Sequence, residues 1–193
     1  MKYHINPETG KPGVCRAKIK CRFNVLDEEH YSSKEDAARA YEKQQSIIVE
    51  KIDNILKIIK SADCLDKLEI ESSSPCMTGV KLNLSRLRDP DLANNNCAPA
   101  TLSLGNYLID LNESTSVPLF DNVKAISVEF KGSEPTFHNA VIVKDFSGDE
   151  FVIDVTASQW RVPVEFPLVR TKADWLIFTE KSSGIKIRDV EIF

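Results

Sequence analysis

Three residues in the second half of the chain have the types and the spacing that cysteine-dependent catalysis requires. Cys97 opens an apolar-periodic segment with Pro99 in its first turn, so we expect its thiol at the N-terminus of a helix. The positive end of a helix dipole favours the thiolate, which is the nucleophilic form. His138 begins one apolar run and Asp154 ends the next, and two paired strands would bring these ends together. His138 would then be the general base for Cys97, and Asp154 would orient the imidazole and stabilise its cation.

Attack on a carbonyl also needs hydrogen-bond donors for the negative oxygen that develops. We expect one donor to be the backbone N–H of Cys97 and the other to be a side-chain amide from the run just before it. The candidate amides are those of Asn94, Asn95 and Asn96. The sequence does not separate these three. Gln159 is a candidate donor behind the catalytic groups, and Trp160 belongs either to the core or to a lid over the His–Asp pair.

Each of these residues also has a purely structural interpretation. A cysteine is frequently a small buried hydrophobe, a histidine can be half-buried with its hydrogen bonds satisfied, and Asp154 can cap a turn through Thr156. The scarcity of histidine favours catalysis, because the chain has three histidines and His138 is the only one beyond residue 30. Cys64 and Cys76 have no histidine nearby in the sequence, so we expect them to be structural.

A second group of candidate ligands lies near the N-terminus. Two histidines and two cysteines fall within the first 30 residues, and these types suit tetrahedral zinc. They are His4, Cys15, Cys21 and His30. The spacing contains no C-x-x-C pair, so a metal-free β-arm is the alternative. Zinc held here would be structural, and we expect the catalytic chemistry to need no cofactor.

The N-terminal third should contain one long helix. Ser32 and Glu35 fit a capping box, and no Gly or Pro interrupts residues 33–60. Apolar residues recur at helical spacing and predict one buried stripe, packed on the body, on a second helix or on a partner chain. The stripe consists of Tyr41, Ile48, Ile52, Ile55 and Ile59. Residues 61–96 are polar and irregular, and we place a boundary near residue 62. A basic N-terminal module with this helix would then occupy 1–62, and a second domain 63–193.

The second domain reads as one helix followed by mostly antiparallel strands, which is an α+β fold. We predict a helix over 98–111, and strands over 123–130, 137–143 and 150–155, with a hairpin turn at 146–149. Further strands are predicted at 175–179 and 185–192.

Composition narrows the classes of protein. The chain has 193 residues, 42% of them apolar, and a formal net charge of −4. No segment reaches the roughly 20 apolar residues of a membrane-spanning helix, and no signal peptide is recognised. The acidic balance argues against a nucleic-acid partner. Five cysteines, an odd number, argue against a disulfide framework and favour a reducing cytoplasm.

The order Cys97, His138, Asp154 resembles the papain-like cysteine hydrolase superfamily. The segment Asp154-Val155-Thr156-Ala157-Ser158-Gln159-Trp160 is similar to small bacterial and phage members, including papain-fold toxin-like domains. The resemblance covers residues 90–165. It implies a cleft between a helix and a sheet, and amide, isopeptide or ester chemistry through a thioester. Peptidases, deamidases and acyltransferases share this layout. The nucleophile lacks the glycine- and tryptophan-rich surroundings of the papain-type proteases, which argues against a general protease.

Residues 1–45 carry a second resemblance. The string Tyr3-His4-Ile5-Asn6-Pro7-Glu8-Thr9-Gly10, followed by Cys15-Arg16-Ala17, His30-Tyr31 and Ala40-Tyr41-Glu42, is similar to a module that precedes varied phage and actinobacterial mobile-element proteins. It implies a delivery, docking or recognition role and a phage or mobile-element origin.

Together these features favour a cysteine hydrolase, a peptidase or deamidase, that acts on an amide or acyl bond of a protein or peptide. The expected setting is the cytoplasm of a bacterium or of a phage-infected host, with a host protein as substrate and the chain as a phage effector. One alternative is a thiol acyltransferase or transglutaminase-like enzyme. Another is a non-catalytic phage protein that binds and inhibits a host protein. The sequence leaves the oligomeric state open.

Overall fold

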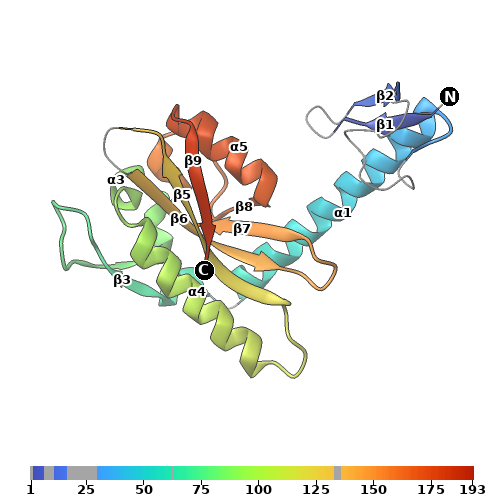
Figure 1. The fold of residues 1–193 in the computed structure, drawn as a ribbon. Helices are drawn as coiled ribbons and strands as arrows, with labels where there is room; N and C mark the ends of the chain where they lie inside the picture. Colours follow the sequence, from blue (N-terminus) through green and yellow to red (C-terminus); the bar gives the residue numbers. More distant parts are fainter. Residues whose placement is uncertain (1, 7–10, 17–29, 62, 133–135) are drawn as a thin grey trace. The chain divides into compact units, whose positions relative to one another are not determined.

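The computed structural model describes the chain except for residues 1, 7–10, 17–29, 62 and 133–135 (Figure 1). It divides into two compact units, Met1–Lys51 and Ile52–Phe193. The division falls inside the long helix α1 (Lys34–Ser61), whereas the sequence analysis placed a boundary near residue 62.

The first unit contains a small antiparallel pair, β1 (Tyr3–Ile5) and β2 (Pro12–Val14), and the first turns of α1. The predicted long helix is confirmed. Its cap is shifted by one residue from the prediction, because the Asp36 N–H donates to the Ser33 hydroxyl (3.0 Å) and the Ser32 hydroxyl donates to the Asp36 carboxylate (2.8 Å).

Burial along α1 follows the predicted stripe in its second half. Ile55 and Ile59 are buried, whereas Ile48 and Ile52 are only half-buried. The buried pair belongs to the second unit and places the end of α1 in its core. The stripe is thus buried most fully toward its C-terminal end.

Residues 63–96 are more regular than the sequence suggested. They form α2 (Cys64–Lys67), the antiparallel pair β3 (Glu69–Glu71) and β4 (Lys81–Asn83), the 3-10 helix η2 (Leu84–Arg88) and α3 (Pro90–Ala93). Each element is five residues or shorter, which is too short for a hydrophobic period to show in the sequence. Leu82, Leu84 and Leu87 nonetheless lie fully buried in this segment.

The main sheet is antiparallel and five-stranded, with the order β8-β7-β6-β5-β9. Its strands are β5 (Asn122–Phe130), β6 (Thr136–Lys144), β7 (Glu150–Asp154), β8 (Leu168–Thr171) and β9 (Ile187–Ile192). With α4 (Cys97–Ser114) they confirm the predicted helix, four of the five predicted strands and the α+β class. The predicted turn between β6 and β7 is also confirmed, with Gly148 at a φ of 93°.

Two helices flank the sheet. On one face α4 packs on β5 and β6, and Gly105 of α4 lies against Val141. On the other face Trp175 of α5 (Lys172–Ser183) joins a core with Val128, Ala140 and Ile142. The sheet is therefore sandwiched between the helix that begins at Cys97 and the helix that carries Trp175.

The prediction of a strand at 175–179 is wrong, because these residues lie in α5. A short apolar run does not distinguish a strand from a buried helix face. The decisive signal lies upstream, where the Thr171 hydroxyl accepts from the Asp174 N–H (3.2 Å) and caps the helix. Trp175 and Thr179, four residues apart, are its buried face. Among the described residues, no helix has the length and apolar character needed to cross a bilayer.

Candidate active site

The thiol of Cys97 lies at the first residue of α4 and is half-buried. The preceding residue, Asn96, makes no side-chain cap with the helix. The first N–H groups of an α-helix have no acceptor within the helix, and Pro99 has no N–H at all. The N–H groups of Cys97 and Ala98 are therefore the ones at this helix end that suit a negative charge.

Strand register brings His138 and Asp154 together. β6 and β7 pair from Val141 opposite Ile153, so Asp154 comes next to Ala140 and diagonal to His138 on the same face. His138 Nε2 lies 2.7 Å from Asp154 Oδ2, and both side chains are fully buried. The pairing that the sequence suggested for these two residues is thus present in the structure.

The Asp154 carboxylate is held by further donors. Thr156 donates to Oδ1 from its backbone N–H (2.9 Å) and its hydroxyl (3.1 Å). The indole N–H of Trp175 donates to Oδ2 (3.0 Å). Burial raises the pKa of Asp154, but the charge and hydrogen bond of His138 and these donors outweigh it, so the net pKa is lowered. Asp154 therefore stays ionised although no water reaches it, and it both caps a turn and pairs with His138.

Two tryptophans fix the plane of the imidazole. The Trp175 ring is stacked near that of His138, with centroids 5.8 Å apart, and Trp160 meets it edge-on at 5.3 Å. Trp160 is half-buried and also lies edge-on to Phe130, so it belongs to the edge of the core and screens the His138–Asp154 pair. Nothing in the sequence pattern indicates this role for Trp175, because the run that contains it resembles a strand.

The Cys97 thiol and the His138 imidazole lie close enough at the N-terminus of α4 for each to shift the pKa of the other. Burial raises the pKa of the thiol, but the hydrogen bond and charge of His138 and the amides of Asn139 outweigh it and lower the pKa overall. Burial likewise opposes the imidazolium, but Asp154 and Cys97 raise the pKa of His138 to about 10. Both shifts favour thiolate and imidazolium at neutral pH, which is the reactive form of a cysteine–histidine pair.

Asn139 is a site residue that the sequence analysis missed. Its side-chain Nδ2 lies 3.7 Å from the Cys97 sulfur, and its backbone N–H also donates there. Neighbouring strand residues point to opposite faces of a sheet, so His138 and Asn139 can both reach one sulfur only at an edge. Both residues do lie at such an edge, because they precede Val141, where the pairing of β6 with β7 begins. The alternation alone gave no signal of this edge position.

Gln159 contacts Nδ1 of the imidazole, the ring nitrogen that is not bonded to Asp154. Its Nε2 lies 2.8 Å from His138 Nδ1, which suits a neutral ring whose Nδ1 accepts a hydrogen bond. The imidazolium carries a proton on Nδ1, so beside that form the Gln159 amide has to present its oxygen. Gln159 thus adjoins the catalytic pair as the sequence suggested and is a positioning residue for the ring.

The three asparagines before Cys97 do not act as one group. Asn96 is fully buried, and all of its amide hydrogens are bonded within the protein. The side chain accepts from the Ser73 N–H (2.9 Å) and donates to the Ser72 hydroxyl (3.2 Å) and the Leu92 carbonyl (2.8 Å). It is therefore a structural link and has no N–H left for an oxyanion. Asn94 and Asn95 are exposed, and among the described residues neither side chain bonds to Cys97. The side-chain amide at the sulfur belongs to Asn139.

An apolar cavity of about 440 Å³ opens beside the thiol. It reaches from Ala98 and Asn139 at the nucleophile along α4 and β5 to the C-terminal Phe193. Leu102, Gly105 and Ile109 form its helical wall. A cavity of this kind holds an apolar group next to the reacting atoms.

Comparisons of the chain with protein-family models, with curated proteins and with solved structures found no match.

We predict that Asn96→Ala destabilises the second unit but leaves the reactivity of the Cys97 thiol unchanged. The change leaves the Ser73 N–H and the Ser72 hydroxyl without their partner, which costs about 1–3 kcal/mol of unfolding free energy. Asn94→Ala, an exposed control two residues away, should change stability by less than about 0.5 kcal/mol. Urea unfolding measures both. Unchanged stability with lost reactivity of Cys97 would instead mark Asn96 as an oxyanion donor.

Proposed function

We propose that the Ile52–Phe193 unit is a cysteine-dependent hydrolase that acts on an amide or acyl bond of a protein or peptide. The observation that carries this proposal is the buried Asp154–His138 pair at 2.7 Å, whose imidazole lowers the pKa of the Cys97 thiol at a helix start. A purely structural cysteine needs neither an ionised carboxylate nor a charged imidazole, both of which are expensive to bury. The resemblance to papain-like hydrolases supports the same chemistry.

In the first step the Cys97 thiolate attacks the substrate carbonyl carbon and forms a C–S bond. The negative oxygen that results takes hydrogen bonds from the helix-start N–H groups and from the Asn139 amide. The His138 imidazolium then gives its proton to the leaving nitrogen or oxygen as the bond to it breaks. A thioester on Cys97 and a neutral His138 remain, and Asp154 keeps the ring in place.

In the second step water attacks the thioester. Neutral His138 takes the proton from the water, and the thiolate leaves with its electron pair as the acid is released. The imidazolium is restored beside the thiolate, so the cycle closes with no cofactor. A thiol acyltransferase would differ only here, with an amine in place of water.

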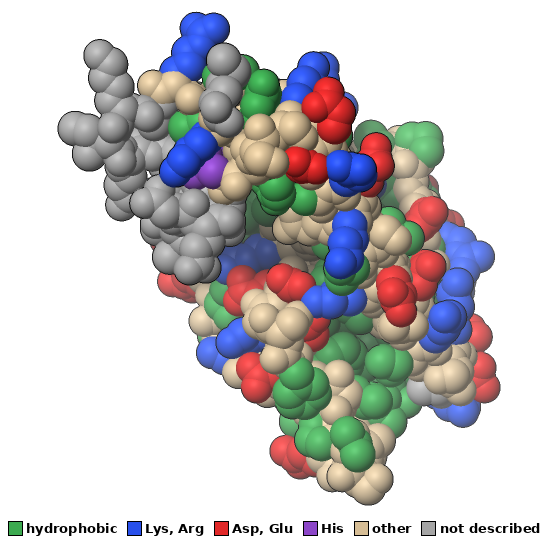
Figure 2. All heavy atoms as spheres, turned by 90° about the vertical axis from the view of Figure 1, so that its right-hand side faces the viewer, with side chains coloured by type: hydrophobic (Ala, Val, Ile, Leu, Met, Phe, Trp, Pro, Cys, Tyr) green, Lys and Arg blue, Asp and Glu red, His purple; other side chains and the backbone are tan. Residues whose placement is uncertain are grey.

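The cavity indicates which part of the substrate binds. Its walls are mostly apolar and it ends at Ala98 and Asn139, the neighbours of Cys97 and His138, so it should take an apolar group on the acyl side of the scissile bond. A protein or peptide supplies such groups. The described part of the face in Figure 2 mixes basic and acidic side chains without an extended basic area, which does not favour a nucleic acid.

The physiological setting follows from the resemblance of the N-terminal unit to modules of phage and mobile-element proteins. The N-terminal unit would target the enzyme, as part of a phage effector, to a host protein in the cytoplasm of a bacterial cell.

Acylation by a chromogenic ester tests the proposed function without knowledge of the natural substrate. Nitrophenyl esters with apolar acyl chains should acylate Cys97 of the full chain, release nitrophenolate and turn over. Intact-mass and peptide mapping should place the acyl group on Cys97, with exposed Cys76 as the internal reference. His138→Ala and Asp154→Asn should lower turnover by about 10²-fold or more.

The product of the same reaction separates the candidate activities. Free acid in water shows a hydrolase, and amide formed preferentially from an added amine shows an acyltransferase. Acylation of Cys97 no faster than that of Cys76 would overturn an enzymatic role and leave a binding protein.

We also predict that Leu102→Glu weakens the use of apolar acyl chains. Leu102 lines the cavity and is 65% exposed, so the fold should tolerate the carboxylate, which repels apolar chains. kcat/KM for a long-chain ester should fall about ten-fold, and that for an acetyl ester should not. Ile177→Glu, equally exposed on α5, is the matched control and should change neither value. Equal losses for both esters would show that the cavity does not bind the acyl group.

A further inference from the structure

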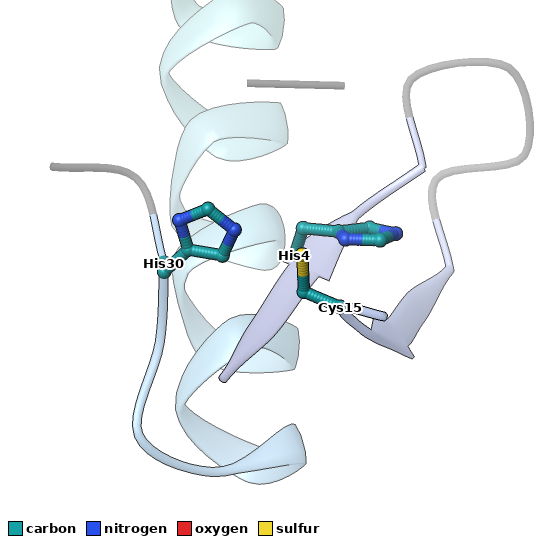
Figure 3. Close-up of side chains that lie close together, drawn as sticks. All are labelled: His4, Cys15 and His30. Atoms are coloured by element: carbon teal, nitrogen blue, oxygen red, sulfur yellow. The ribbon is translucent and has the colours of Figure 1, made fainter. Parts of the chain in front are cut away.

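We infer that His4, Cys15 and His30 form a zinc site in the N-terminal unit. Their ligand atoms, two imidazole nitrogens and one sulfur, all lie within 4.8 Å of one another. Figure 3 shows the three side chains gathered beside α1, from β1, from the end of β2 and from the segment before α1. Three of the four ligands that the sequence suggested thus meet, and Cys21 lies outside the described residues.

Backbone hydrogen bonds assemble this cluster. Register between β1 and β2 sets His4 opposite Gly13, and the Cys15 N–H donates to the Lys2 carbonyl (2.8 Å). Tyr3 and Tyr31 exchange two backbone bonds (2.9 and 2.8 Å), which fixes His30 next to β1. The three ligand segments are therefore held in place by bonds other than those to a metal, which reduces the entropy lost on binding one.

The imidazole of His30 gives the strongest indication of a bound ligand. Both of its ring nitrogens are shielded from solvent, and neither has a hydrogen-bond partner among the described residues. Leaving a buried polar group unpaired is unfavourable, so such groups are normally satisfied. A metal ion bound to one nitrogen would satisfy the lone pair that the protein leaves unused.

The described part of the N-terminal unit has almost no hydrophobic core. In the described part of Met1–Lys51, Ala37 is the single fully buried hydrophobic side chain. Units this small usually need a staple such as a structural metal or disulfides. A metal at the cluster would tie β1, β2 and the segment before α1 to one point.

The donor set favours zinc. Two imidazoles and a thiolate suit a borderline ion, whereas Ca²⁺ and Mg²⁺ prefer oxygen ligands. Ligands of tetrahedral zinc lie about 3.3–3.8 Å apart, so small rotations of these side chains would close the site. The three ligands leave a fourth position for water or a further side chain.

Metal analysis of the full chain tests the inference. Protein purified from zinc-supplemented cells without chelators should carry about one zinc per chain. Cys15→Ser and His30→Ala should each lose most of it, whereas Cys76→Ser, an exposed cysteine of the other unit, should keep it. Wild-type protein with less than about a tenth of an equivalent, or zinc retained by both ligand variants, would overturn the site.

Alkylation of the wild type covers the case in which the variants fold poorly. A zinc-bound thiolate is protected, so a chelator should speed the labelling of Cys15 by about ten-fold or more. The labelling of Cys97 in the second unit should not change, which separates this test from that of the proposed catalysis. A labelling rate of Cys15 that does not change on addition of the chelator would contradict zinc binding.

Discussion

The hydrogen bond between His138 and Asp154 is the interaction on which the rest of the second unit is organised. Two ionisable groups without solvent contact are unfavourable to bury unless every lone pair and proton is matched. Here the match is close to complete, because Thr156 and Trp175 fill the remaining positions of the carboxylate. The register of β6 and β7 brings His138 and Asp154 together. The turn after β7 supplies the Thr156 donors, and α5 supplies the indole N–H of Trp175.

The second constraint is geometric. Cys97 comes from the helix on one face of the sheet, whereas the core around Trp175 and His138 lies on the other face. The Cys97 thiol can approach His138 because β7 pairs with β6 only from Val141 onward. His138 and Asn139 therefore lie at an edge that β7 does not cover. The apolar cavity runs from this edge along α4, so the nucleophile sits where a buried charge network and an accessible surface adjoin.

Much of this arrangement was predictable from the sequence, where local signals agree with the fold. Alternating runs and a glycine turn predicted β5, β6 and β7, and that hairpin brings His138 near Asp154. Pro99 with an apolar period predicted a helix from residue 98, directly after Cys97, and α4 begins one residue earlier, at Cys97. The role of Asn96 was not predictable, because its partners, Ser72 and Ser73, lie more than twenty residues upstream in short elements without a period. The role of Trp175 depends on long-range packing, and that of Asn139 on its position at a strand edge. Neither feature can be recognised from the spacing of nearby residues.

The central claim is that Cys97 is held as a thiolate by His138, and alkylation of the full chain across pH tests it most directly. The pKa of Cys97 is lowered and that of His138 is raised to about 10, so the ion pair should form below the usual thiol range and persist until the imidazolium loses its proton. Iodoacetamide should therefore label Cys97 rapidly at pH 6, where an ordinary thiol of pKa about 8.5 is almost fully protonated. Burial raises the pKa of Cys64 to about 11, so that residue should stay unlabelled. His138→Ala should move the Cys97 profile to higher pH. A Cys97 that labels no faster than exposed Cys76 at pH 6, or whose profile ignores His138→Ala, would contradict the account.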